Sequence, residues 1–463
     1  LPTAAIDSTP LEALQDSIIV TANPALKGSA IKHLFLGRNY RAEWTQPLTV
    51  PVFDIGTEMA GLKPMRLGGG KQTKSLRIED KEGKEWVLRS IQKFPEAAIP
   101  ADLRSSIAKE IVEQGISASY PYASLSYGTF AEAIGLPVLR KKLVYVPDDP
   151  RLERFRGDFS RTLAVMEERE PLTVKKTYNT DELILRLAKD NDDHVDHRVV
   201  LKARLLDNFI MDFDRHEDQW RWATRDTGKG KIYYPIARDQ DQAFFTNQGI
   251  IPYFVKKPWV VPEIQGFQAN TDNIKTFNRP ARNFDRFFLS ELSEDQWSNQ
   301  IDSFLLMMTD EVIIKALNQQ PREIKNLSMN NIIKTLEKKR KFFKKDMIEY
   351  YKFLAKEVSV VGSNQRELFT VSKKDSGVQV MVNKIDKDGN ISSKIYDRLF
   401  DPSVTQELRL YGLSDKDSFV VNGGESPIKV RIIGGPGNDE FVNNGNGGKV
   451  LLYDASFEEN KIS

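Results

Sequence analysis

The spacing of hydrophobic positions changes along the chain near residue 358. Before that point, long stretches repeat their apolar positions every three to four residues, which is typical of amphipathic helices. After it, apolar and polar positions alternate over short runs separated by Gly, Asn and Asp, which is typical of strands and tight turns. We therefore expect a region of mixed helices and strands, followed by an all-β unit that is a sandwich or a short solenoid.

Individual elements follow from the same patterns. Residues 67–91 contain two apolar runs around a glycine-rich turn and predict a β-hairpin with a lysine at its tip. The predicted helices cover 26–36, 102–134 with a break at Pro121, 181–187, 199–213, 293–317 and 330–358. The predicted strands cover 141–146, 162–166, 231–236, 367–372, 378–385, 407–411, 418–421, 428–433 and 449–453.

Length and composition narrow the classes of function. A chain of 463 residues exceeds what one core fills, so we expect two or three units. The 67 basic and 65 acidic side chains give a net charge of +2, which provides no overall attraction to nucleic acid, and we expect no nucleic-acid partner. The absence of cysteine excludes thiol nucleophiles and thiolate metal sites, and four histidines favour an oxygen-liganded metal. We also expect no transmembrane segment, because no long apolar run occurs.

Two acid-rich loops are the densest groups of reactive side chains. The first is Asp212–Trp220, and the second, Arg238–Phe244, follows a predicted strand. If the chain folds back between them, their carboxylates suit a divalent cation that bridges phosphate oxygens, with another Asp left to accept a proton. The alternative is a buried salt-bridge network in which these acids pair with the arginines of the same loops.

The predicted glycine hairpin lies upstream of the acidic loops. Glycine leaves backbone N–H groups open to a phosphate because no Cβ keeps the ligand away, although a plain hairpin tip has the same sequence. The next strand presents Arg89, and further along Lys93, as fixed cations. This order of hairpin, strand cation, helix, strands and acidic loops is the one used for phosphoryl transfer from ATP. The residues at the hairpin tip are Gly68, Gly69, Gly70 and Lys71.

The first acidic loop also resembles a known catalytic loop. Asp214-Arg-His-x-x-Gln219 is similar to the Asp-Arg-His-x-x-Asn loop of the phosphatidylinositol-kinase group and, more loosely, to the Asp-x-His loop of HipA-type kinases. Secretory-pathway kinases have a similar element. The resemblance covers about residues 60–320 and implies that Asp214 is the catalytic Asp, with Arg215 and His216 beside it. Gln219 would replace the Asn that helps hold the metal.

The same resemblance implies further roles. Asp239 or Asp241 would bind Mg²⁺ or Mn²⁺ with ATP, and Glu167 would lie on the fifth strand near the adenine. The chain departs from the kinase pattern at Arg89, which stands where a Lys is usual, because a planar guanidinium does not reproduce an ammonium. The helix Glu that should pair with this cation is not assigned. Its candidates are Glu110, Glu113 and Glu132.

The chain as a whole resembles a Bacteroidetes envelope family. In that family this region lies between a calcineurin-like phosphoesterase domain and an outer-membrane barrel of the surface-antigen type. The resemblance rests on 68–77, 212–222, 238–244 and 407–413. It implies the periplasm or cell envelope as the location and an outer-membrane barrel protein as a partner. The chain begins at Leu1, and we expect an upstream signal peptide to have been removed.

The all-β unit contains one motif that bears on metal binding. Gly434-Gly-Pro-Gly-Asn-Asp439 matches one copy of the Ca²⁺-binding turn of β-roll proteins. Because a β-roll needs several stacked copies to complete each ion's shell, we favour a tight turn over a Ca²⁺ site here.

These observations together predict an α+β protein. We expect an N-terminal extension over 1–60, a bilobal protein-kinase-like domain over 61–357 with lobes of about 61–170 and 171–357, and a small all-β C-terminal domain over 358–463. The expected function is that of an atypical kinase-like envelope protein, a metal- and ATP-dependent phosphotransferase. The alternative is an inactive kinase-like scaffold that serves an outer-membrane protein or assembly machinery.

Overall fold

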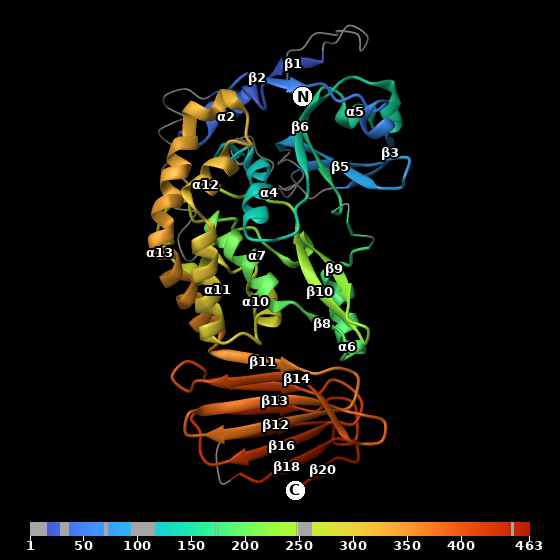
Figure 1. Ribbon diagram of the computed structural model, residues 1–463, viewed down its shortest axis with the longest axis vertical. Helices are drawn as coiled ribbons and strands as arrows, with labels where there is room; N and C mark the ends of the chain where they lie inside the picture. The colour runs from blue at the N-terminus through green and yellow to red at the C-terminus, as the bar shows by residue number, and fades with distance from the viewer. Residues whose placement is uncertain are drawn as a thin grey trace, which may run out of the picture.

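The computed structural model describes residues 16–27, 37–68, 73–93, 116–171, 173–174, 176–246, 248, 262–445 and 449–463. Figure 1 shows three regions along the long axis: a β-rich region that holds the N-terminal strands, a region of helices, and an all-β unit that holds the C-terminus. Among the described helices, none is both long and apolar enough to cross a membrane.

The N-terminal region is built around a five-stranded antiparallel sheet in the order β3–β4–β5–β7–β6. Its strands are β3 (Lys63–Gly68), β4 (Thr73–Glu79), β5 (Glu85–Lys93), β6 (Lys141–Val146) and β7 (Thr162–Glu168). Strand β7 is buried at every position, so both faces of the sheet are covered at this strand. A separate antiparallel pair consists of β1 (Ser17–Val20) and β2 (Leu48–Pro51).

The middle region consists mainly of helices. Helix α6 begins with a capping box in which Asn179 and Glu182 each receive the other's backbone N–H, and Ser293 and Gln296 do the same for α11. The helices are α2 (Arg41–Thr45), α4 (Ala123–Ala133), α5 (Arg156–Phe159), α6 (Thr180–Lys189), α7 (His197–Phe209), α9 (Ile274–Phe277), α10 (Arg282–Phe288), α11 (Glu294–Met307), α12 (Asp310–Leu317) and α13 (Asn330–Leu354). A small sheet contains β8 (His194–Val195), β9 (Trp220–Asp226) and β10 (Lys231–Ala237).

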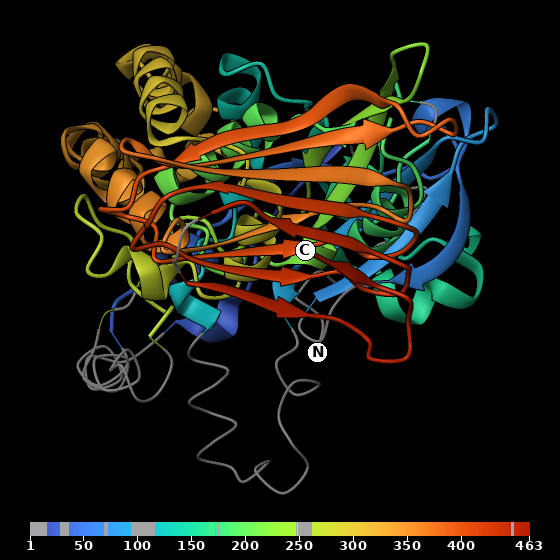
Figure 2. The same cartoon turned by 90° about the horizontal axis from the view of Figure 1, so that it is seen from below.

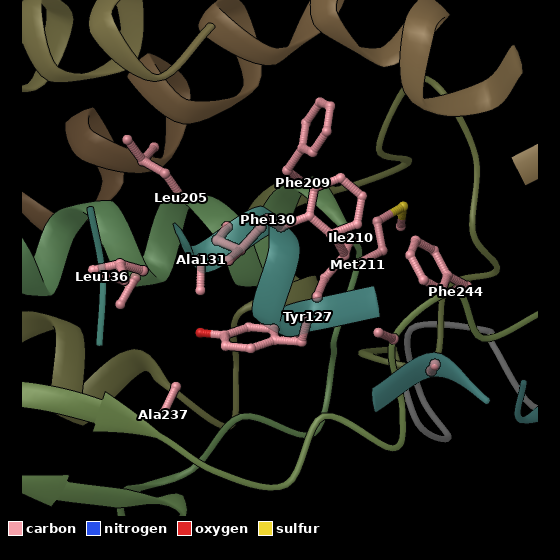
Figure 3. Close-up of a cluster of buried hydrophobic side chains, with 14 of the residues drawn as sticks. Tyr127, Phe130, Ala131, Leu136, Leu205, Phe209, Ile210, Met211, Ala237 and Phe244 are labelled. Atoms are coloured by element: carbon pink, nitrogen blue, oxygen red, sulfur yellow. The ribbon is translucent and has the colours of Figure 1, made fainter. Parts of the chain in front are cut away.

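The principal core lies around α7. Figure 3 shows Phe130 of α4 near Phe209 of α7, with Met211 and Phe244 beside them from the loops that follow α7 and β10. All four side chains are at most 1% exposed. The loops that carry the acid-rich motifs are therefore attached to a rigid core at their bases.

A buried ionic network joins α7 to α10 and α13. Arg204 donates hydrogen bonds to both carboxylate oxygens of Asp285, over 2.7 and 3.2 Å, and to Asp207 over 2.8 Å. Tyr350 of α13 donates its hydroxyl to Asp285 over 2.7 Å. Since Arg204, Asp207 and Asp285 are at most 2% exposed, each charge depends on its partners for compensation.

The C-terminal unit is a short solenoid with a hairpin inserted, the second of the two predicted forms. Strands β11, β15, β17 and β19 form one parallel ladder, and β12, β16, β18 and β20 form another; the hairpin β13–β14 extends the second ladder (Figure 2). Phe369, Phe419 and Phe441 stack between successive coils, with ring centroids 4.7 and 5.3 Å apart. The strands are β11 (Glu357–Val361), β12 (Glu367–Lys374), β13 (Gly377–Ile385), β14 (Ile391–Phe400), β15 (Glu407–Tyr411), β16 (Ser418–Gly423), β17 (Lys429–Ile433), β18 (Glu440–Asn443), β19 (Val450–Tyr453) and β20 (Lys461–Ile462).

The predicted fold class, an α+β pair of lobes followed by a small all-β domain, is confirmed. Several boundaries differ from the prediction. The last helix ends at Leu354 rather than at 358, because Glu357–Val361 alternates in burial and pairs with β15. Strands β9, β14 and β18 had no prediction. The predicted helix 26–36 and the first part of 102–134 lie mostly outside the described residues.

Replacing Asp285 with Ala should lower the free energy of unfolding by about 3–5 kcal/mol, because Arg204 would stay buried without its main counter-charge. Urea unfolding followed by circular dichroism measures this loss. The control is Asp295→Ala, which removes an exposed acid from the first turn of α11 and should cost less than about 1 kcal/mol. Equal losses in the two variants would contradict a stabilising role for the network.

Candidate functional site

Strand β5 brings two cations to the second acidic loop. Arg89 and Lys93 are four positions apart on this strand, and both side chains reach the same loop. Arg89 Nη1 lies 3.3 Å from Asp239 Oδ2, and Lys93 Nζ lies 2.8 Å from Asp241 Oδ2. The sheet cations and the acids predicted to hold metal are thus in direct contact, although about 150 residues separate them in sequence.

Glu167 fixes the position of Arg89. Its carboxylate accepts from Arg89 Nη2 over 3.1 Å and pairs with Lys141 Nζ over 3.2 Å, and its side chain is 3% exposed. Burial favours the neutral acid, but Lys141 and Arg89 outweigh it and lower the pKa of Glu167 to about 2. Glu167 is therefore an ionised group that anchors two cations, and its place near the adenine stays a prediction.

The described carboxylate partners of Arg89 do not come from a helix, so the helix Glu expected from the sequence stays unassigned. In the described part of the chain these partners come from strand β7, as Glu167, and from the loop after β10. Glu132 lies on α4, where its carboxylate is 4.0 Å from Lys315 and 71% exposed. Glu110 and Glu113 lie outside the described residues.

Arg215 holds the first acidic loop from inside. It donates to Asp207 over 3.0 Å and to Asp212 over 3.1 Å, and its side chain is 1% exposed. Its Nη1 also donates to the side-chain oxygen of Gln219 over 3.1 Å and to the backbone oxygen of Arg238. Arg215 therefore connects the two acidic loops through buried hydrogen bonds and is a positioning residue.

Asp214 and His216 lie on the open side of this loop. Asp214 is only partly buried, and His216 is 39% exposed, with its Nδ1 3.8 Å from Asp218. Burial and the charge of Asp241 raise the pKa of Asp214 above its usual value. Asp214 is thus near the second loop and shares its electrostatic environment. Gln219 is buried and directed toward Arg215.

The acids of the second loop have opposite pKa shifts. Burial raises the pKa of Asp239, while Arg89 only partly offsets this effect. Burial also acts to raise the pKa of Asp241, but the Lys93 ammonium outweighs it, so the pKa of Asp241 is lowered. Asp239 also has a left-handed backbone with φ of +57°, which a non-glycine residue adopts at a cost of about 1–3 kcal/mol. Such strain is found at functional sites held by their surroundings.

A second group of cations lies behind Arg89. Arg238 has a buried Nε without a hydrogen-bond partner among the described residues. Burial and the nearby charges of Arg89, Arg169 and Arg221 lower its pKa to about 10. Arg169 is paired with Glu85, and the charge of Glu167 acts to raise the pKa of Arg238, so this group contains acids as well as cations. The sequence did not predict this group, because Arg169 and Arg221 come from separate segments.

The described side chains do not by themselves form a complete set of metal ligands. Among the described residues, no three His, Asp or Glu side chains group around a position that could hold a metal. Asp239 and Asp241 fit a hard cation by their oxygen chemistry, and phosphate and water oxygens would have to supply the remaining ligands, as they commonly do for Mg²⁺. Gly68 ends strand β3 opposite Ser75, while Gly69, Gly70 and Lys71 lie outside the described residues.

A cavity of about 960 Å³ lies elsewhere, between α6, α7 and α10 and the all-β unit. Its wall includes Leu187, Phe288 and Tyr396, and it contains none of the predicted site residues. The polar cluster at β5 is the better candidate for chemistry, because it joins shifted carboxyl pKa values to a strained backbone.

Comparison with known proteins gives remote similarities only. No family model and no curated protein matches the chain. Two solved structures are similar at 12% identity. One is the proinflammatory kinase CtkA of Helicobacter pylori, with a TM-score of 0.31, over 60% of this chain and 95% of that one. The other is HipA of Shewanella oneidensis MR-1, from a toxin–antitoxin complex with HipB and operator DNA, with a TM-score of 0.30, over 66% and 76%. These scores indicate no correspondence between individual residues.

Proposed function

We propose that the protein is an atypical kinase-like phosphotransferase that uses ATP with Mg²⁺ or Mn²⁺. The observation that carries the proposal is the pairing of Arg89 with Asp239 and of Lys93 with Asp241. A strand cation facing a metal-binding acid is the arrangement by which kinases hold the phosphates of ATP and their metal ion.

The two ion pairs can exchange partners with a metal nucleotide. A phosphate chain brings negative charge for Arg89 and Lys93, and its divalent cation brings positive charge for Asp239 or Asp241. Each side chain therefore keeps a compensated charge when the pairs open, so the exchange avoids leaving a buried ion alone. Asp239 and Asp241 are 29% and 27% exposed, so incoming ligand atoms can reach them.

Asp214 would accept the proton of an acceptor hydroxyl or orient it. Burial and Asp241 raise its pKa, and a base with a pKa closer to the working pH accepts a proton more readily. Glu167 would keep Arg89 in place, and Arg215 would keep the two loops in register. Positioning and charge compensation would then supply most of the rate enhancement.

The second candidate function is a catalytically inactive scaffold. It is favoured by Gln219, whose side-chain oxygen accepts from Arg215 and is turned away from the role of a metal ligand. In this alternative the ion pairs at β5 stay closed and serve only to join the two lobes. The cell-envelope location and the outer-membrane partner belong to both proposals, and both rest on the resemblance in sequence.

Binding of Mg²⁺–ATP separates the two candidates. The wild-type protein should bind it with saturable heat in calorimetry, and Asp241→Asn should bind at least tenfold more weakly while still binding metal-free ATP, because Lys93 is released but a metal ligand is lost. The control is Asp218→Asn, whose side chain is 88% exposed. If the wild type gives no heat with ATP and either Mg²⁺ or Mn²⁺, the scaffold is the correct account.

Turnover tests the role of Asp214. Asp214→Asn should keep nucleotide binding but lower the rate of ATP hydrolysis or self-phosphorylation by about 10²–10⁴, as expected for loss of a catalytic base. Release of phosphate and transfer of ³²P from ATP measure the two rates. Asp218→Asn, in the same loop, should retain the wild-type rate, and a full rate in Asp214→Asn would rule out the assigned role.

A further inference from the structure

The solenoid repeats one turn at the same corner of successive coils. In three successive coils a glycine follows the first strand, and an acid lies five residues later, at or just before the start of the second strand. The parallel register places Val361, Tyr411, Ile433 and Tyr453 side by side, so the turns that follow them are stacked. The glycine and acid of each coil are Gly362 and Glu367, Gly412 and Asp417, and Gly434 and Asp439.

One oxygen of the Asp417 carboxylate and one of the Asp439 carboxylate link neighbouring coils. The backbone N–H of Glu367 donates to Asp417 Oδ1 over 2.8 Å, and that of Asp417 donates to Asp439 Oδ1 over 2.7 Å. The backbone N–H of Asp439 donates to the side-chain oxygen of Asn460 over 2.8 Å. The single glycine-and-aspartate turn that the sequence shows at 434–439 is thus one of a stack, which corrects the expectation of an isolated tight turn.

The second oxygen of the Asp417 and Asp439 carboxylates has no partner among the described residues, whereas both oxygens of Glu367 accept hydrogen bonds. Asp417 Oδ2 and Asp439 Oδ2 are buried without a hydrogen bond among the described residues, and the two side chains are at most 1% exposed. Asp454 Oδ2, in the next coil, is buried and unpartnered in the same way. Such orphaned acceptors are costly unless something else binds them.

These free oxygens converge on the glycines. A Cβ on Gly434 would lie 2.3 Å from Asp439 Oδ2 and 2.6 Å from Asp454 Oδ2, so both oxygens face this glycine and leave no room for a side chain there. One coil earlier, a Cβ on Gly412 would lie 2.4 Å from Asp417 Oδ2 and 2.5 Å from the backbone oxygen of Gly434. The corner therefore holds a column of carboxylate and carbonyl oxygens.

The column lacks compensating charge. No ion pair in the described part of the chain joins Asp417, Asp439 or Asp454 to a Lys or Arg. The acids need either protons or a cation.

We propose that this corner of the solenoid binds Ca²⁺, with Asp439 and Asp454 on one ion and backbone oxygens of the stacked turns completing its shell. Ca²⁺ takes six to eight oxygen ligands in flexible geometry, which suits two carboxylates and several carbonyl groups. Mg²⁺ requires a near-ideal octahedron and keeps its waters, so it fits this buried column less well. The proposed site has only two carboxylates. Among the described residues, no three His, Asp or Glu side chains come together around a possible metal position. The proposal does not depend on the phosphotransferase activity.

The test uses the full chain freed of metal by a chelator. Adding about 5 mM Ca²⁺ should raise the melting temperature by about 4 °C or more and give saturable heat in calorimetry, since a ligand that binds only the folded state stabilises it. The same concentration of Mg²⁺ should do neither. Asp439→Asn and Asp454→Asn should each lose the Ca²⁺-dependent shift, while Asp388→Asn, in the exposed hairpin turn, should keep it.

The competing explanation is that protons neutralise the column. In that case Ca²⁺ would give neither heat nor a shift to the wild-type protein, and this result alone would overturn the proposal. An equal response to Mg²⁺ would also overturn it, as would a Ca²⁺ shift that survives in Asp454→Asn. The wild-type measurement keeps the test decisive even if Asp439→Asn does not fold.

Discussion

The contact between the cations of β5 and the acids after β10 is the constraint on which the candidate site depends. Arg89 and Lys93 belong to the sheet of the first lobe, and Asp239 and Asp241 belong to a loop attached to the core of the second. The contact therefore joins the two lobes with charges that a metal nucleotide can also satisfy. The four side chains of these two ion pairs close the site, and the same side chains would bind its ligand.

Buried arginines keep this contact in register. Arg215 connects the two acidic loops, and Arg204 joins the helix before them to α10 through Asp285. Both guanidiniums are nearly inaccessible and fully paired, so they contribute rigidity where the chemistry needs fixed geometry. This explains how Arg215, inside the motif that resembles a catalytic loop, can matter without meeting a substrate.

The sequence predicted the fold class because it depends on local patterns and on the order of elements. The same order indicated that the Asp214 loop and the Asp239 loop would lie near each other. It could not predict that Glu167 anchors Arg89 or that Lys93 pairs with Asp241, because such contacts depend on how distant strands and loops pack. The prediction that the last helix continues to 358 was wrong, because strand β11 begins at Glu357. This strand pairs with β15, whose residues lie 50 positions further along the chain.

The solenoid shows why a repeat can be hidden. Glu367 and Asp417 are equivalent positions 50 residues apart, whereas Asp417 and Asp439 are 22 apart, because the hairpin β13–β14 is inserted after the first coil. No fixed period exists for a sequence pattern to detect. Only the parallel register of the strands aligns the acids.

The most direct test of the proposed nucleotide site is a crystal structure of the protein with Mn²⁺ and a non-hydrolysable ATP analogue. Anomalous scattering would locate the metal in this structure. The account predicts Mn²⁺ bound to Asp239 or Asp241, with Arg89 or Lys93 moved onto the phosphates. A structure in which both ion pairs remain closed, and neither metal nor nucleotide lies between the lobes, would contradict it.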